Sequence, residues 1–273
     1  MRRRSYKRIH VVGCSPRSGT TLLAELMVNA FRIDGFPEHE MSIFARPRGD
    51  YEIVLTKLPG DVLNVRPLLW WWPDLWVICM VRDPRDVVVS QHGNHPGVYY
   101  AGLNLFKEGW PAARRLRGHP RFTLIRYEDL VRDPDAIQAE LQRRIPFLEK
   151  RAAFSDYHRV ARPSVDSLKA LGGVREVTPR NLGSWRRHKA RLVTQLQRHG
   201  PITEELIELG YEKDDAWLGE LAGVAPDGST SVRKEYPPLR ERARRRWLRL
   251  RHTVRCMLGL ERRYPLVRRE DAA

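Results

Sequence analysis

A run of small and polar residues near the N-terminus has the composition of a loop that binds an anion. Residues 13–21 read Gly-Cys-Ser-Pro-Arg-Ser-Gly-Thr-Thr, after an apolar run at 9–14 and at the start of a segment with helical apolar spacing at 20–31. Backbone N–H groups at the start of such a helix can point at a phosphate. A plainer interpretation also stays open, namely a strand-to-helix turn capped by Ser15 or Ser18.

The cation of this loop does not stand where a nucleoside triphosphate would need it. In the pattern G-x-x-x-x-G-K-[ST] a lysine follows the second glycine, whereas Ser18 and Gly19 take the Gly-Lys positions here and the cation comes earlier, as Arg17. A guanidinium fork with the hydroxyls of Thr20 and Thr21 suits an anion of fewer charges that is bound without a metal ion.

Four apolar segments predict the strands that position this loop and the loops beside it. They are 9–14, 52–56, 75–81 and 121–126, and helical segments follow at 20–31, 87–91 and 134–144. Strands that alternate with helices predict an α/β fold, a P-loop-type doubly wound parallel sheet flanked by helices.

Beyond residue 150 the pattern becomes helical and ends in a helical C-terminal extension. A Gly- and Pro-containing stretch divides the chain into an expected α/β domain at 1–222, a linker at 223–239, and a basic helix and tail at 240–273. Trp247, Leu250, Val254 and Met257 share one face of that helix. The helix either packs on the body with its arginines in solvent or lies on a membrane surface.

Four motifs, in this order along the predicted elements, resemble those of the PAPS-dependent sulfotransferases. Together they cover about residues 9–190 and are most similar to the subgroup with a P-R-S-G-T-T loop, the bacterial-like or tyrosylprotein-sulfotransferase-like members. The motifs are Pro16-Arg17-Ser18-Gly19-Thr20-Thr21, the 3′-phosphate motif VRDPRDVVVS at 81–90, YEDL at 127–130, and LGSWR at 182–186, which resembles a late G-x-W segment.

The resemblance implies a donor, PAPS, and a place for each of its parts. The 5′-phosphosulfate would lie on the 16–21 loop, without a metal ion, and Arg82 and Ser90 would hold the 3′-phosphate. Tyr127 would contact the adenosine, and Arg180 would close over the 3′-phosphate, although its spacing differs from that of the family's R-K-G segment. The implied reaction is in-line transfer of the sulfonate from PAPS to a hydroxyl or amine, which leaves adenosine 3′,5′-bisphosphate.

The catalytic residues implied by the resemblance are Arg17, Glu38 and Lys57. Arg17 would stabilise the leaving oxygen, or would hold only the ground-state phosphate. In the P-R-S-G-T-T subgroup a glutamate 21 residues after the loop arginine acts as the base, which gives Glu38, with His39 and Glu40 as runners-up. All three could equally be solvated loop charges.

Lys57 stands where other members of the family carry a catalytic histidine. A lysine could serve the sulfonate electrostatically, but it would need a lowered pKa to accept a proton. This departure favours Glu38 as the base.

The net charge of +16 is concentrated at the two ends of the 273-residue chain. Residues 1–8 carry five basic and no acidic side chains, and 233–273 carry 14 basic and five acidic ones, which leaves 30 basic and 28 acidic side chains in 9–232. A uniformly basic nucleic-acid-binding domain is therefore disfavoured, and we expect no nucleic-acid partner. The 42% of hydrophobic residues excludes a disordered chain.

Cysteine usage and the lengths of the apolar runs indicate a cytoplasmic protein. Three scattered cysteines form no disulfide framework, and no apolar run has the length of a membrane span or a signal peptide. We expect a small-molecule, glycan or lipid acceptor, with peripheral membrane contact through the C-terminal helix as a further interpretation. The alternatives are a P-loop nucleotide or small-molecule kinase and a binding module that uses the basic ends.

Overall fold

The structure is a computed structural model that describes residues 6–38, 40–92, 95–161, 163, 165–171, 173–180 and 182–268. Its strands are β1 (Lys7–Gly13), β2 (Gly35–Phe36), β3 (Arg46–Arg48), β4 (Ile53–Lys57), β5 (Leu75–Val81), β6 (Gln91–His92), β7 (His95–Tyr99), β8 (Phe122–Arg126), β9 (Arg263–Pro265) and β10 (Val267–Arg268).

Helices connect these strands and extend the fold beyond β8. The α-helices are α1 (Thr20–Ala30), α2 (Val65–Trp71), α3 (Pro84–Val88), α4 (Leu103–Arg114), α5 (Tyr127–Arg132), α6 (Pro134–Arg144), α7 (Tyr157–Val160), α8 (Val165–Leu171), α9 (Lys189–His199), α10 (Thr203–Glu208) and α11 (Leu239–Met257), and the 3₁₀ helices are η1 (Pro59–Leu63), η2 (Ser184–Arg187) and η3 (Ala216–Leu221).

The central sheet has the order β10-β2-β4-β1-β5-β8 and is parallel except for β10 at its edge. After β1 the chain forms β4 on one side of β1 and then crosses to form β5 on the other side of β1, so the strand order reverses at β1. In open parallel sheets this switch point is where ligands bind, outside the carboxyl ends of the strands. The predicted α/β fold with a parallel sheet flanked by helices is confirmed.

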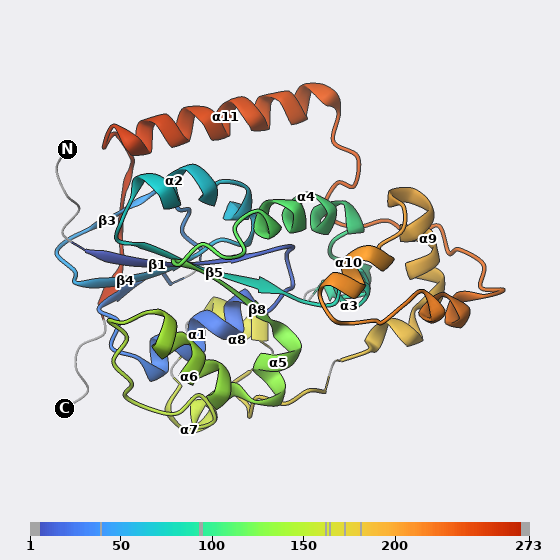
Figure 1. Ribbon diagram of the computed structural model, residues 1–273, viewed down its shortest axis with the longest axis horizontal. Coiled ribbons are helices and arrows are strands. Elements are labelled where there is room, and N and C mark those ends of the chain that lie inside the picture. The colour runs from blue at the N-terminus through green and yellow to red at the C-terminus, as the bar shows by residue number, and fades with distance from the viewer. Residues whose placement is uncertain are drawn as a thin grey trace.

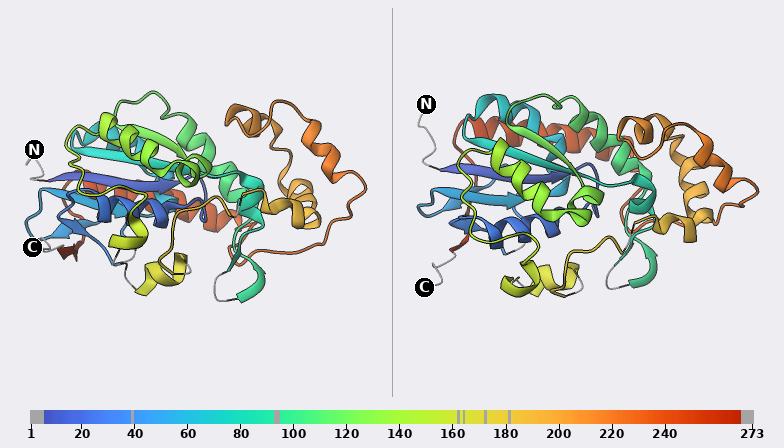
Figure 2. Two further views of the ribbon diagram at one scale, coloured as in Figure 1. Left: turned by 90° about the horizontal axis from the view of Figure 1, so that it is seen from below. Right: turned by 60° about the horizontal axis from the view of Figure 1, so that its bottom comes forward.

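Alternating side chains on β1 divide the core into two layers. Ile9 and Val11 pack with α1 and α6, while Val12 packs with α2 and α4 on the opposite face. Figure 1 shows the same layers, with α11 lying outside α2. The helices α9 and α10 lie at the end toward which β1 and β5 point, as both orientations in Figure 2 also show.

Local signals predicted most of the elements around the sheet. The strand expected at 75–81 and the helix expected at 134–144 match β5 and α6 residue for residue. The helix expected at 87–91 instead spans Pro84–Val88, so its expected end is also wrong. It begins at Pro84 because the Asp83 carboxylate caps it by accepting a hydrogen bond from the N–H of Arg85 at 2.9 Å. No helix was predicted over α4, which contains the helix breakers Gly109 and Pro111.

Residues from both basic ends of the sequence belong to the central sheet. Arg8 belongs to β1 and is fully buried, with hydrogen bonds from its guanidinium to Thr56 and to the carbonyls of Ser42, Ile43 and Ala45. The C-terminal strand β10 joins the central sheet. The expected division into a domain, a linker and a tail stays a prediction.

The apolar face predicted for the last helix is not the face that packs. Thr253 and Cys256 of α11 are buried, whereas Trp247, Leu250 and Val254 are 58%, 65% and 46% exposed. The helix does pack on the body, but of the residues named for its apolar face only Met257 packs against the core. Of the helices in the described part of the chain, none has both the length and the apolar character to cross a membrane.

Gly109 of α4 sets the closest approach between a helix and the loop after β1. A Cβ atom at this position would overlap the backbone carbonyl of Cys14. We expect Gly109→Ala to lower the free energy of unfolding by about 1–3 kcal/mol, because overpacking outweighs the better helix propensity of alanine. Urea unfolding measures this loss.

The control is Gly219→Ala in η3, where an added Cβ meets no atom within 4 Å. Its unfolding midpoint should stay at the wild-type value. A Gly109→Ala protein as stable as wild type would show that α4 does not rest on the loop.

Candidate functional site

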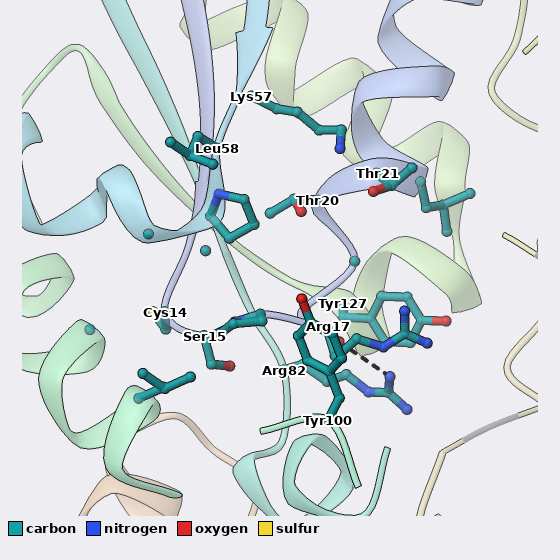
Figure 3. Close-up of a pocket in the computed structure, with 18 of the residues that line it drawn as sticks. Cys14, Ser15, Arg17, Thr20, Thr21, Lys57, Leu58, Arg82, Tyr100 and Tyr127 are labelled. Carbon is teal, nitrogen blue, oxygen red and sulfur yellow. Dashed lines mark hydrogen bonds between the residues drawn. The ribbon is translucent and has the colours of Figure 1, made fainter. Parts of the chain in front are cut away.

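A cavity of about 710 Å³ lies at the carboxyl ends of the central strands. It is lined by the loop after β1, by Lys57 and η1 after β4, by Arg82 after β5 and by Tyr127 after β8 (Figure 3). Three crossover connections of the sheet therefore meet at one place. The segments 173–180 and 233–234 and the side chain of Arg245 complete the lining.

The loop after β1 is built to present its backbone. Gly19 has φ +92 and is the N-cap of α1, which has no side-chain cap. The buried Ser18 hydroxyl donates to the carbonyl of Ser15 at 2.8 Å, so it fastens the loop instead of capping the helix. The interpretation of a turn capped by Ser15 or Ser18 is therefore wrong, and the residues at the start of α1, Thr20 and Thr21, line the cavity.

Arg17 adopts a left-handed backbone conformation, with φ +68. Its Nε donates to the hydroxyl of Ser90 at 3.0 Å. Arg82 reaches the same loop, because its Nη1 donates to the carbonyl of Arg17 at 3.4 Å and its guanidinium lies 4.7 Å from the ring centre of Tyr127. Two cations from separate strand ends thus converge on one loop.

Burial and the neighbouring charge of Arg82 both lower the pKa of Arg17. Both causes disfavour a charged guanidinium, and a bound anion would remove the cost of the like charges. The Ser15 hydroxyl supports the same conclusion, because it is buried at the cavity wall and has no hydrogen-bond partner among the described residues. The site therefore fits an anion that accepts hydrogen bonds.

Two acidic side chains fasten the motifs to one another. The Glu128 carboxylate accepts the N–H of Asp83 at 3.0 Å, which joins the end of β8 to the turn after β5. The Asp86 carboxylate accepts the N–H groups of Gly183 at 2.8 Å and Trp185 at 3.0 Å, which joins the same turn to the late G-x-W segment.

Arg85 completes this framework from within the turn. Its guanidinium contacts the carboxylates of Asp83 and Glu212 at 2.7 and 2.5 Å and lies 4.6 and 5.0 Å from the ring centres of Trp185 and Trp217. Arg85 is buried, so it holds the motifs together and does not face the cavity.

Most residues that the sequence singled out lie at the cavity, but not all. Ser90 is not among the lining residues and reaches the loop through Arg17, and Ser18 lies buried beneath the loop. Glu38 is exposed and does not line the cavity, and His39 lies outside the described residues. Those that line the cavity are Pro16, Arg17, Gly19, Thr20, Thr21, Glu40, Lys57, Arg82, Tyr127 and Arg180.

Glu40 and Lys57 form a pair at the cavity wall. The Lys57 ammonium lies 3.6 Å from a carboxylate oxygen of Glu40, and Lys57 is buried while Glu40 is partly exposed. Burial lowers the pKa of Lys57, although the charge of Glu40 opposes the shift. Of Glu38 and Glu40, the acidic residues considered as a base, Glu40 is the one that lines the cavity.

Comparison with known proteins finds a family whose model matches part of the chain. Residues 40–145 match the model of the sulfotransferase family, a segment that contains Lys57, Arg82, Ser90 and Tyr127. Over this segment, which is less than half of the chain, the sequence is similar to that family. The resemblance seen in the sequence is thereby confirmed. Among curated proteins, none matches the chain in sequence.

Solved structures of sulfotransferases are similar to this chain at low sequence identity. The sulfotransferase domain of the Synechococcus PCC 7002 olefin synthase is 15% identical, with a TM-score of 0.46, over 68% of this chain and 89% of that one. The sulfotransferase domain of the curacin biosynthetic pathway is 14% identical, with a TM-score of 0.47, over 67% of this chain and 91% of that one. A Mycobacterium avium sulfotransferase is 13% identical, with a TM-score of 0.34, over 82% of this chain and 79% of that one. TM-scores below 0.5 do not establish the chemistry of the site, which rests on its own residues.

Several residues that line the cavity were not singled out from the sequence. They come from segments distant in the chain. Only those after position 232 had a sequence signal, the excess of basic residues there. Among the residues not singled out are Tyr100, Arg175, Arg233, Lys234 and Arg245.

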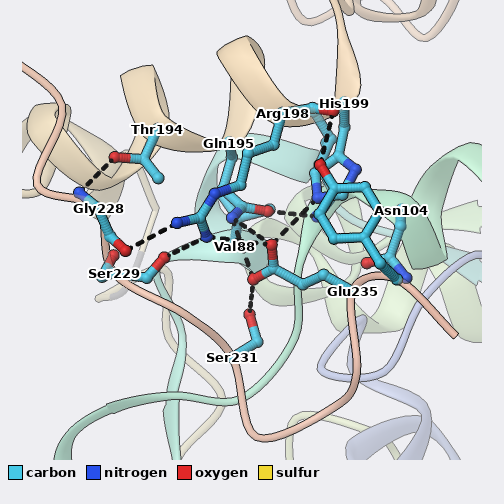
Figure 4. Close-up of polar contacts among 12 residues, drawn as sticks. Val88, Asn104, Thr194, Gln195, Arg198, His199, Gly228, Ser229, Ser231 and Glu235 are labelled. Atoms are coloured by element: carbon cyan, nitrogen blue, oxygen red, sulfur yellow. Dashed lines mark hydrogen bonds and ion pairs between the residues drawn. The ribbon is translucent and has the colours of Figure 1, made fainter.

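Glu235 holds the segment that carries Arg233 and Lys234 (Figure 4). Its carboxylate accepts from Ser231 at 2.7 Å and Gln195 at 3.1 Å, and it contacts Arg191 at 3.3 Å. The segment expected as a linker is therefore irregular but fastened to α9.

Burial by itself would raise the pKa of Glu235. Hydrogen bonds from Ser231, Gln195 and His199 and the charge of Arg191 outweigh burial and hold this pKa at about 2, below the usual 4.5. A depressed carboxyl pKa stabilises the folded state above pH 4.5. That contribution is lost as the pH falls from 4.5 toward about 2.

We expect Glu235→Gln to lower the stability of the protein at neutral pH and to flatten the acid dependence of that stability between pH 4.5 and 2. Backbone amides around 229–236 should exchange faster with deuterium, because the fastening of that segment to α9 is weakened. Hydrogen exchange and urea unfolding at several pH values test both effects. Glu204→Gln on the exposed start of α10 is the control, and an acid dependence equal to wild type in Glu235→Gln would contradict the assignment.

Proposed function

We propose that the protein transfers the sulfonate of PAPS to a hydroxyl or amine, with adenosine 3′,5′-bisphosphate as the second product. The observation that carries the proposal is the convergence of Arg17 and Arg82, from the ends of β1 and β5, on one loop at the switch point of the sheet. A donor with phosphate groups at its 3′ and 5′ positions requires two separate anion sites beside one loop. Bidentate guanidinium groups suit both.

The residues of the cavity divide between the two ends of this donor. Residues 16–21, with Arg17 and the first N–H groups of α1, would hold the 5′-phosphosulfate. Arg82 and Ser90 would hold the 3′-phosphate, with Arg180 closing over it from the 173–180 segment. Tyr127, whose ring packs on Gly19, would carry the adenosine. None of these contacts requires a metal ion.

The reaction is a displacement at sulfur. The acceptor oxygen or nitrogen forms a bond to sulfur while the bond from sulfur to the 5′-phosphate oxygen breaks, and the bisphosphate leaves with the electron pair. Arg17 would stabilise the negative charge that develops on the leaving oxygen, and Lys57 would stabilise the negative charge on the sulfonate. The acceptor proton passes to a carboxylate.

We assign this carboxylate to Glu40 in preference to Glu38. Glu40 lines the cavity beside Lys57, whereas Glu38, the residue that the family spacing favoured, does not line it. The acceptor remains a small molecule, a glycan or a lipid. We place the enzyme in the cytoplasm, with peripheral contact to a membrane.

A screen of hydroxylated and amine acceptors with labelled PAPS tests the proposed reaction. Transfer of label to any acceptor, with formation of adenosine 3′,5′-bisphosphate, supports it. Binding of ATP with Mg²⁺ and no binding of the bisphosphate would favour a kinase instead.

Arg82→Ala should weaken binding of adenosine 3′,5′-bisphosphate by about 1.5–3 kcal/mol, the scale of a charge-assisted hydrogen bond. Titration calorimetry measures this loss. Arg143→Ala, an exposed arginine of α6, is the matched control and should bind as wild type does. Equal affinities of wild type and Arg82→Ala would remove Arg82 from the nucleotide site.

Glu40→Gln should lower kcat by roughly 10²–10⁴, because a general base of this kind contributes that factor. Affinity for the bisphosphate should stay within a small factor of wild type. Glu38→Gln, two residues away and outside the cavity, is the control. A loss of kcat in Glu38→Gln with normal turnover in Glu40→Gln would return the base to Glu38.

A further inference from the structure

The outward face of α11 carries an apolar stripe that no described part of the chain covers. The stripe recurs at spacings of three and four residues, which places its members on one side of a helix. All of its members are exposed, with Leu239 at 79%, Leu250 at 65% and Leu258 at 67%. We call the following residues the outer stripe: Leu239, Ala243, Trp247, Leu250, Val254 and Leu258.

The opposite face of α11 accounts for its packing on the body. Cys256 is fully buried in the core layer that α2 and α4 share, and the His252 ring stacks on Phe44 with 5.6 Å between the ring centres. Figure 1 shows α11 as the outermost layer on this side, lying along α2. The outer stripe is therefore not needed to hold the helix in place.

Arginines border the outer stripe on both sides. Helical geometry places Arg240, Arg244 and Arg251 along one edge and Arg242 and Arg246 along the other. The Arg251 guanidinium lies 5.4 Å from the ring centre of Trp247. In total α11 has eight arginines and one glutamate.

We propose that α11 docks on an anionic lipid bilayer, with the outer stripe in the interface and the bordering arginines on the lipid headgroups. An apolar face with tryptophan, edged by cations, is the pattern of a helix that lies in the plane of a membrane surface. Arginine stems can cover apolar surface while the guanidinium reaches headgroup phosphates.

Charge complementarity favours an anionic bilayer over a second copy of the chain or a nucleic acid as the partner of α11. A second copy would place eight further arginines against the eight of α11, and like charges across an interface are repulsive. A nucleic acid would use the arginines and leave the outer stripe in water. An anionic bilayer would contact both the arginines and the outer stripe. Leu260 and Tyr264, which follow the helix along the chain, are also exposed apolar residues, at 55% and 44%.

Docking would bring the cavity close to the membrane surface, because Arg245 of the same helix lines it. The docking itself does not depend on the identity of the donor or acceptor. Its failure can therefore be distinguished from a failure of the proposed sulfonate transfer.

Co-sedimentation of the full chain with vesicles tests the proposal. We expect binding to vesicles of phosphatidylcholine with phosphatidylglycerol, little binding to phosphatidylcholine alone, and weaker binding at high salt. The double variant Leu250→Glu, Val254→Glu should lower the partition coefficient about tenfold or more, since each side chain loses its apolar burial. The matched control is Ile207→Glu with Leu218→Glu, two apolar residues on α10 and η3 that are 43% and 40% exposed. It should bind the vesicles as wild type does.

A second variant isolates the electrostatic contribution. Arg244→Gln with Arg251→Gln should reduce binding to anionic vesicles by about thirtyfold, at roughly 1 kcal/mol for each of the two charges, and should leave the melting temperature unchanged. This pair also keeps the test decisive if the glutamate variant fails to fold.

Three results would overturn the proposal. The first is no binding of wild type to anionic vesicles at low salt. The second is an equal loss in the control pair, and the third is a dimer in sedimentation velocity that Leu250→Glu, Val254→Glu dissolves. Binding to an oligonucleotide that the glutamate pair leaves unchanged, without binding to vesicles, would assign α11 to nucleic acid instead.

Discussion

The acidic side chains at the ends of β5 and β8 hold the candidate site together. Asp86 accepts two N–H groups from the G-x-W segment, almost a hundred residues further along the chain, and Glu128 accepts the N–H of Asp83. Buried carboxylates cost free energy unless donors surround them, and backbone N–H groups supply those donors here. Hydrogen bonds therefore join the turn after β5 both to the start of α5 and to the G-x-W segment. Arg82 extends from the start of this turn.

This support explains why two guanidinium groups can be held beside one loop. Arg17 and Arg82 repel each other, and the unusual backbone of Arg17 adds conformational strain. Rigid neighbours must balance both costs: Ser90 accepts from Arg17, and Tyr127 packs on Gly19 beneath Arg82. Such an arrangement is stabilised most when a ligand with two anionic groups binds, which agrees with the donor proposed for this protein.

The excess positive charge of the chain has at least three separate structural roles. Arg8 is buried in β1 and ties the 42–45 segment to the sheet. Arg233 and Arg245 face the cavity, and the arginines of α11 border the outer stripe. A net charge is a sum over these environments, so it indicates neither a nucleic acid nor any other single partner.

The sequence by itself determined the features whose signals are local. The apolar run of β5 and the helical pattern of α6 both depend on neighbouring residues, and these predictions agree with the structure. Only the tertiary structure decided that Glu40 and not Glu38 lines the cavity, that Arg8 is buried, and which side of α11 packs. Each of these depends on contacts between segments far apart in the chain. A helix with apolar residues and arginines on several sides carries no local signal for the face that its neighbours will cover.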